Sequence, residues 1–171
     1  MKTKTLLKVM NVLAWIAFIG SMMVAGSITI SYLVSIGNPQ AAKYLYKDLD
    51  LSAYRRQNFT NYTFVVCYKV ILYITQAYIA FLMTKLLSTI NISRPFSAGA
   101  VQLMQKISYA ILCFWLVTVV NNTHILILEK TYGLVGTYIS GDSIFLAGVV
   151  YILAQLFKRG VEIQSENELT V

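Results

Sequence analysis

Four long apolar segments alternate with shorter polar ones along this chain. They cover about residues 9–36, 64–87, 98–128 and 143–159. A helix needs roughly 17–25 predominantly apolar residues to cross the hydrocarbon core of a bilayer, which is about 30 Å thick. Each segment reaches that length, and the pattern therefore predicts four membrane-spanning helices.

Two of the segments contain features that fit a bilayer poorly. In the second, the uncharged run between Lys69 and Lys85 is Val70–Thr84, which gives only about 22 Å of helix. This is shorter than the hydrocarbon core, so Lys69 must enter the membrane. Its ammonium is expected either to extend toward the interface or to meet a polar partner between the helices. In the fourth, the apolar run Ile144–Phe157 is short, and Gly160 predicts the end of the helix.

Composition places the chain in a lipid environment. Hydrophobic residues make up 57% and charged residues 12%, whereas soluble domains carry about 25% charged residues. The predicted fold class is therefore an all-α, integral membrane four-helix bundle. Residues 1–160 are expected to form the transmembrane domain, with the lipid bilayer as its main partner, and residues 161–171 an acidic cytoplasmic tail.

Basic residues predict the orientation. Four crossings put both termini on one side, and cytoplasmic segments carry an excess of Lys and Arg. Eight fall on the terminal side: Lys2, Lys4, Lys8, Lys85, Arg94, Lys106, Lys158 and Arg159. Five fall on the other: Lys43, Lys47, Arg55, Arg56 and Lys130. The count predicts a multi-pass protein of the inner cell membrane with both termini in the cytoplasm. Because these residues stand singly at segment ends, the net charge of +7 does not indicate direct nucleic-acid binding.

Other patterns predict how the helices pack. Small residues recur every fourth position in the first segment, at Ala17, Ser21, Ala25 and Thr29, and predict its packing face. Cys67 and Cys113 stand singly in apolar segments and are expected to be buried. The polar stretch 42–62 predicts a short interfacial helix, and 58–63 a loop.

The end of the chain resembles a known family. Residues 145–171, FLAGVVYILAQLFKRGVEIQSENELTV, resemble the C-terminal signature of the domain-of-unknown-function 2975 family of bacterial membrane proteins. That signature is an apolar helix, then FKRG-E-L-Q-E-N-DLT and a final Ile or Val. Matching positions are Phe157, Lys158, Arg159, Gly160, Glu162, Gln164, Glu166, Asn167, Leu169, Thr170 and Val171, whereas Ile163 and Glu168 replace Leu and Asp. The Pro95-Phe96 turn is also similar to that family.

The resemblance implies four membrane helices and no established activity. Members of the family are often encoded beside a small helix-turn-helix regulator, which implies such a regulator as a cytoplasmic partner. The tail is the predicted contact, through Glu162, Gln164, Glu166, Asn167, Leu169, Thr170 and Val171. We expect it to be extended or disordered alone and to bind by strand addition or a similar mode. The alternatives are a frayed terminus or a tail folded back on Lys85, Arg94 and Lys106.

A second candidate site follows from the predicted topology. Six polar residues are expected in one layer near the outer side of the membrane: Lys69, Asn121, Asn122, His124, Glu129 and Asp142. Intramembrane ionisable groups often mark a ligand or ion path, and Lys69 would pair with Glu129 or Asp142. The alternative is a set of interfacial anchors and structural hydrogen bonds.

Nothing in the sequence indicates an enzyme. It contains no phosphate-binding glycine loop, no GxSxG or HExxH motif and no paired carboxylates. His124 is the only histidine, so neither a metal site nor a cofactor is expected. The leading hypothesis is a regulatory membrane protein that binds a cytoplasmic partner. The alternatives are a small transport or immunity protein using the outer polar layer, or a structural subunit; a channel would require a homo-oligomer.

Overall fold

The chain is built from four long helices and two short ones. The computed structural model describes residues 2–46, 49–90 and 97–169, and these contain helices and no strand. The elements are α1 (Lys2–Gly37), the 3-10 helix η1 (Pro39–Lys43), α2 (Ser52–Gln57), α3 (Phe59–Thr89), α4 (Ala98–Tyr132) and α5 (Ser143–Leu169). Among them, α1, α3, α4 and α5 are long and apolar enough to cross a membrane. The prediction of an all-α protein with four membrane-length helices is confirmed.

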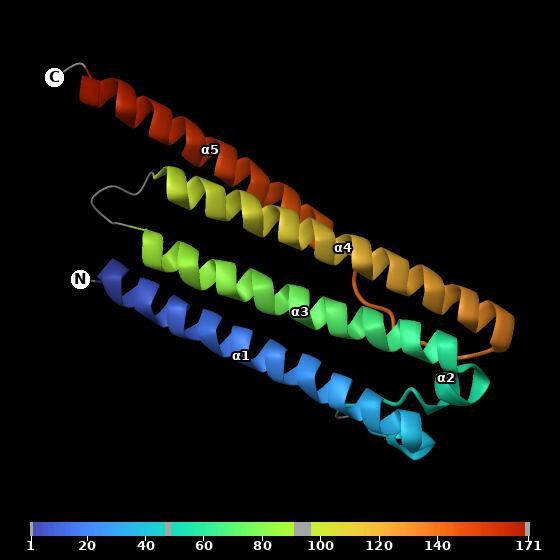
Figure 1. Cartoon of the computed structure of the whole chain (residues 1–171). Coiled ribbons are helices and arrows are strands. Elements are labelled where there is room, and N and C mark those ends of the chain that lie inside the picture. Colours follow the sequence, from blue (N-terminus) through green and yellow to red (C-terminus); the bar gives the residue numbers. More distant parts are fainter. Residues whose placement is uncertain (1, 47–48, 91–96, 170–171) are drawn as a thin grey trace.

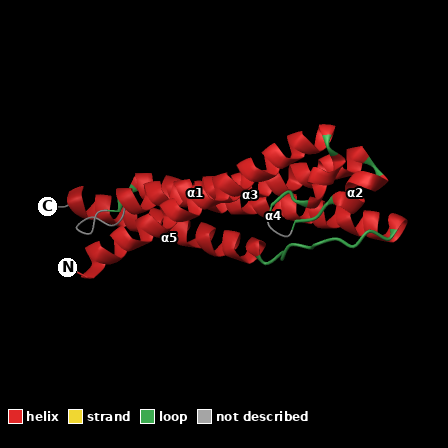
Figure 2. Cartoon of the chain, turned by 90° about the horizontal axis from the view of Figure 1, so that it is seen from below, coloured by secondary structure: helices red, strands yellow, loops and turns green. Residues whose placement is uncertain are grey.

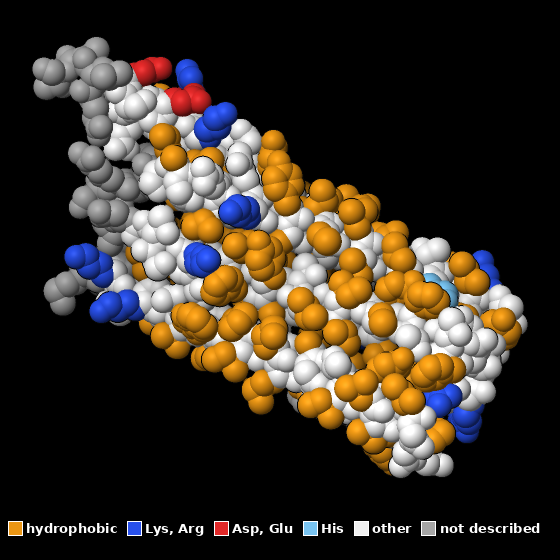
Figure 3. All heavy atoms as spheres, in the orientation of Figure 1, with side chains coloured by type: hydrophobic (Ala, Val, Ile, Leu, Met, Phe, Trp, Pro, Cys, Tyr) orange, Lys and Arg blue, Asp and Glu red, His pale blue; other side chains and the backbone are white. Residues whose placement is uncertain are grey.

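The long helices stand in a row in chain order. In Figures 1 and 2 they lie side by side in one layer, with both termini at the same end. Helix α3 packs between α1 and α4, and α5 packs on α4 alone, so within the described residues α1 touches neither α4 nor α5. Apolar side chains cover the middle of the face shown in Figure 3, with Lys and Arg toward its two ends. This is the distribution expected of a multi-pass membrane protein.

Two polar side chains begin the central helices. The Asn58 side chain accepts a hydrogen bond from Thr60 N (2.7 Å), and α3 starts at Phe59. The prediction of a loop over residues 58–63 is therefore wrong: the asparagine caps a helix rather than forming a turn. A serine directly before the third apolar segment predicts a helix N-cap, and this is confirmed for Ser97, because its hydroxyl accepts from Ala100 N (3.2 Å). Gly133, at φ 67°, ends α4 in the left-handed region.

Helix α5 is longer than predicted. It continues through Gly160 to Leu169, so the predicted end near residue 159 and the extended tail are both wrong as far as Leu169. Starting a helix is costly, whereas adding residues to an existing one is not, and the tail is rich in Glu and Gln, which favour helix. Arg159 and Glu162 form an ion pair (2.9 Å) across the junction. Thr170 and Val171, like the Pro95-Phe96 turn, lie outside the described residues.

Helix α1 packs through a different line of side chains from the one predicted. The partly or fully buried positions include Ala14, Phe18, Ser21, Ala25 and Ile28, whereas Ala17 and Thr29 are exposed. A strict four-residue repeat advances about 400° per step and winds around an α-helix, while alternating steps of three and four follow a neighbouring helix. The predicted stripe therefore leaves the interface at both ends.

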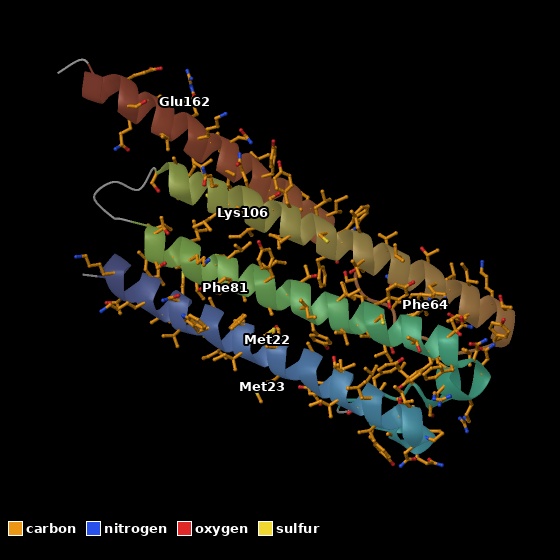
Figure 4. The ribbon with its side chains drawn as sticks, viewed as in Figure 1. Met22, Met23, Phe64, Phe81, Lys106 and Glu162 are labelled. Atoms are coloured by element: carbon orange, nitrogen blue, oxygen red, sulfur yellow. The ribbon has the colours of Figure 1, made fainter. Side chains whose placement is uncertain are left out.

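Both cysteines are exposed, not buried as predicted. In water an apolar residue is driven inside, but lipid is as apolar as a protein core and exerts no such force. Many apolar side chains accordingly face outward, among them Met23 of α1, which is 69% exposed and points away from the other helices (Figure 4).

We predict that Ala25→Leu destabilises the protein and Ala17→Leu does not. Ala25 is 4% exposed in the α1–α3 interface, so added methyl groups must displace a helix, whereas Ala17 faces outward. Overpacking of this kind costs about 1–3 kcal/mol. Thermal unfolding of both variants in detergent measures the difference, and equal melting temperatures would contradict the interface described.

Candidate functional site

The connection between α4 and α5, residues 133–142, folds back along the row. The Ser108 hydroxyl of α4 donates to the carbonyl of Ala147 (2.9 Å), so the start of α5 lies level with about residue 112 of α4. From there α4 rises roughly 30 Å to Tyr132, at 1.5 Å per residue. Ten residues span at most about 33–36 Å, and the connection must therefore return nearly extended alongside the membrane-spanning helices.

Side chains of α2 and α4 hydrogen-bond this extended connection. The amide of Asn122 accepts from Ile139 N (3.1 Å) and donates to Ile139 O (2.7 Å). Tyr54 donates to the carbonyl of Val135 (3.4 Å), and Tyr138 donates to the carboxylate of Glu129. Non-helical backbone at membrane depth is tolerated only where the protein or water satisfies it. These side chains supply such partners.

The same contacts affect the two phenols. Burial raises the pKa of Tyr54 above its ordinary value. The hydrogen bond to Glu129 is the main reason that the pKa of Tyr138 is also raised. Tyr54 donates its hydroxyl to the connection and Tyr138 donates to Glu129 of α4.

Of the six residues predicted to form one polar layer, five fall into three groups and Lys69 stands apart. Asn122 and Glu129 bond the connection, and Asn121, which is fully buried, donates to Asn122 (3.1 Å). Asp142 accepts from the Ser140 hydroxyl within the connection. His124 lies edge-on to the rings of Phe64 and Tyr68 (centroid distances 6.1 and 5.8 Å), with its Nδ1 unpaired. These contacts fit the structural alternative for five of the six residues.

Lys69 is the exception. It is 8% exposed, and it forms no ion pair or hydrogen bond with the described part of the chain. The predicted pairing with Glu129 or Asp142 is therefore wrong: Tyr138 and Ser140 occupy those carboxylates. Instead, Lys69 lines a cavity of about 570 Å³ and a smaller one of about 90 Å³.

The larger cavity exists because the extended connection takes the place of a helix beside α3 and α4. Four of its residues, Lys69, Leu72, Tyr73 and Gln76, recur at helical spacing along one face of α3. Phe114 of α4 and Thr137 and Ile139 of the connection are further walls, with Tyr46 and Leu49. We call this space the Lys69 cavity. Sequence analysis missed Gln76 and Thr137, although the spacing of Lys69 and Gln76 already placed both on one face.

A second group of predicted site residues lies at the opposite end of the row. Glu162 helps to line a groove of about 340 Å³ between α4 and α5, and Figure 4 shows it near the end of α5. Gln164 and Glu166 lie on the same helical extension. The backbone of Asn167 and Leu169 is helical, but their side chains, and Thr170 and Val171 entirely, lie outside the described residues.

Comparison with protein families adds one finding. The family described as "protein of unknown function (DUF2975)" matches residues 37–171. The chain belongs to the DUF2975 family. The part shared with DUF2975 begins at the last residue of α1, and it contains the Lys69 cavity, the connection and the α5 extension. No match was found among curated proteins or among solved structures.

The described residues of this DUF2975 protein contain no cluster of three His, Cys, Asp or Glu side chains able to hold a metal ion. The site instead combines the buried amine of Lys69 and the amide of Gln76 with apolar walls and the hydroxyls of three residues, Tyr46, Tyr73 and Thr137. Such a set can bind and orient an anionic molecule that also has an apolar part.

We predict that Gly136→Ala disturbs the connection and Gly141→Ala does not. A Cβ on Gly136 would lie 2.1 Å from Ile125 Cγ2 and 2.8 Å from the Tyr54 hydroxyl, whereas one on Gly141 meets nothing within 4 Å. The first variant must push the connection away from α4, at a cost of about 1–3 kcal/mol. Thermal unfolding in detergent tests this, and equal stability of the two variants would contradict the close approach.

Proposed function

We propose that this protein is a non-enzymatic regulatory membrane protein that binds a cytoplasmic protein through the extension of α5. The observation that carries the proposal is that α5 continues as a helix for ten residues beyond Arg159, past its apolar part. The resemblance to DUF2975 favours a small helix-turn-helix regulator as the partner. Because the extension is helical, we propose docking along a helix face in place of the strand addition expected earlier.

The surface at this end suits a protein partner. The groove between α4 and α5 is lined by Ala98, Val101, Gln102, Gln105, Lys158, Val161 and Glu162. Beyond the groove on α5, the apolar side chain of Ile163 is 47% exposed. The charged residues Lys158, Arg159 and Glu162 precede it in the sequence. An exposed apolar side chain within a polar rim is the arrangement typical of an interface anchor.

The position of α5 suggests how binding would be regulated. It lies at the edge of the row and, among the described long helices, packs mainly on α4, so it can shift without displacing α1. In one conformation, α5 would leave the groove between α4 and α5 accessible, and the protein would hold the regulator at the membrane. In a second conformation, with α5 shifted, the protein would release the regulator. This works as a switch only if the two conformations differ in their affinity for the regulator.

We propose that both termini face the cytoplasm at the inner cell membrane. We predict that, in a Cys67→Ala, Cys113→Ala background, a cysteine replacing Ser165 reacts with a membrane-impermeant maleimide only after the cells are opened. A cysteine replacing Thr131, at the far end of α4, should react in intact cells. The reverse pattern would overturn the orientation, and with it the cytoplasmic partner.

We predict that the α5 extension is required for partner binding. A photo-crosslinking residue at position 163 should capture a soluble helix-turn-helix protein, whereas the same residue at Ile152, in the apolar part of α5, should not. Ile163→Asp should weaken co-purification of that protein at least tenfold, as loss of an apolar anchor does. Ile163→Leu is the control and should bind normally. Equal recovery of the partner with a chain ending at Gly160 would contradict docking at the extension.

A second candidate function is transport or immunity through the outer polar site. The observation that favours it is the Lys69 cavity, which combines a buried cation with apolar walls. Co-purification separates the two functions, because only the regulatory protein requires a stoichiometric soluble partner.

A further inference from the structure

Lys69 lies at an energetically unfavourable position. It is ten residues, or roughly 15 Å, into α3 from Phe59, among apolar residues of a membrane-spanning helix. Only 8% of the residue is exposed, and no described carboxylate forms an ion pair with it, although Asp50 lines the smaller cavity with it. A charged side chain at membrane depth is costly unless it is paired, and such residues mark binding or transport sites.

The Lys69 cavity has the size of a ligand site. At about 570 Å³ it falls within the range of roughly 300–1,000 Å³ found for small-molecule pockets. It could hold on the order of twenty non-hydrogen atoms, at about 30 Å³ for each as in liquid water. This corresponds to one acyl chain with its acidic group, and a phospholipid with two acyl chains exceeds it.

The walls of the cavity differ along its length. Lys69 and, two turns away on the same face of α3, Gln76 provide nitrogen donors, and Thr137 adds a hydroxyl. Leu72, Phe114 and Ile139 provide apolar walls of the same cavity. A ligand that matches this arrangement has one negative charge and an apolar chain.

We propose that the Lys69 cavity binds a single-chain carboxylic acid, such as a long-chain fatty acid, with its carboxylate on the Lys69 ammonium. The apolar chain then lies against Leu72, Phe114 and Ile139. This inference goes beyond the proposed binding of a cytoplasmic protein and does not depend on it. The site lies at the end of the row opposite the α5 extension, so either one can fail without the other.

A comparison within the protein supports Lys69 over other basic residues. Lys106 also lines a cavity, of about 400 Å³, with Tyr78 and Tyr109. Lys106 is exposed, however, so its ammonium lies at the surface of the protein and not in a buried site. It therefore provides the matched control.

We predict that oleate binds the purified full-length chain at Lys69. Native mass spectrometry in detergent, with increasing oleate, gives the Kd from the bound fraction. Lys69→Met should weaken binding by roughly 10- to 100-fold, as expected for loss of one charge-assisted hydrogen bond. The variant should remain folded, because an apolar residue of similar length replaces a buried unpaired charge. Lys106→Met should bind like the unmodified chain.

Further measurements distinguish the contribution of the ligand's charge to binding from that of the cavity's size. Thr137→Trp fills the cavity from the exposed connection, and it should weaken oleate binding at least tenfold with Lys69 intact. Oleyl alcohol, with the same chain and no charge, should bind at least tenfold more weakly than oleate, and so should dioleoylphosphatidylglycerol. Equal affinity of the unmodified chain and Lys69→Met for oleate would overturn the proposal. Equal affinity for oleate and its alcohol, or tighter binding of the phospholipid, would also overturn it.

Discussion

Helix α5 is long enough to cross a bilayer, but its uninterrupted apolar run is short, and the arrangement of this end of the protein is built around that constraint. Ile144–Phe157 gives about 21 Å of helix against a hydrocarbon core of roughly 30 Å. The start of α5 therefore lies partway along α4, beside Ser108, and an extended connection covers the remaining depth. Backbone of that kind needs hydrogen-bond partners inside the membrane. Asn122 and Tyr54 provide them from α4 and α2, far away along the chain.

The same constraint produces the two candidate sites. A thin extended connection fills less space beside α3 and α4 than a helix does, which leaves the Lys69 cavity at one end of the row. At the other end, the shifted α5 passes the start of α4 and projects as a polar helix that carries Glu162 and Ile163. A ligand bound at Lys69 would contact Thr137 and Ile139 of the connection, and the connection leads directly into α5. The connection thus provides a continuous physical path between the Lys69 cavity and the α5 extension.

Packing against lipid explains the errors in the predicted interfaces. In water, hydrophobicity and burial change together, so an isolated cysteine in an apolar segment is expected inside. In a row one helix thick, most apolar side chains face lipid, and Cys67 and Cys113 are exposed. The contact line of α1 is set by its crossing with α3, which selects Phe18 and Ile28 along with the small Ser21 and Ala25. Residue type alone does not show that Ala25 lies in the interface and Ala17 outside it.

Length and hydropathy determined the class of this protein from sequence alone, because a bilayer requires long apolar helices wherever they stand in the final arrangement. The Ser97 cap is equally local and is confirmed. The partners of polar residues depended on tertiary structure. Glu129 pairs with Tyr138 and Asn122 with Ile139 because the connection folds back along α4, and no pattern of residues along the chain encodes that path. The position of Lys69 in a cavity, without an ion-pair partner among the described residues, also depends on tertiary structure, because α4 and the connection form the other walls.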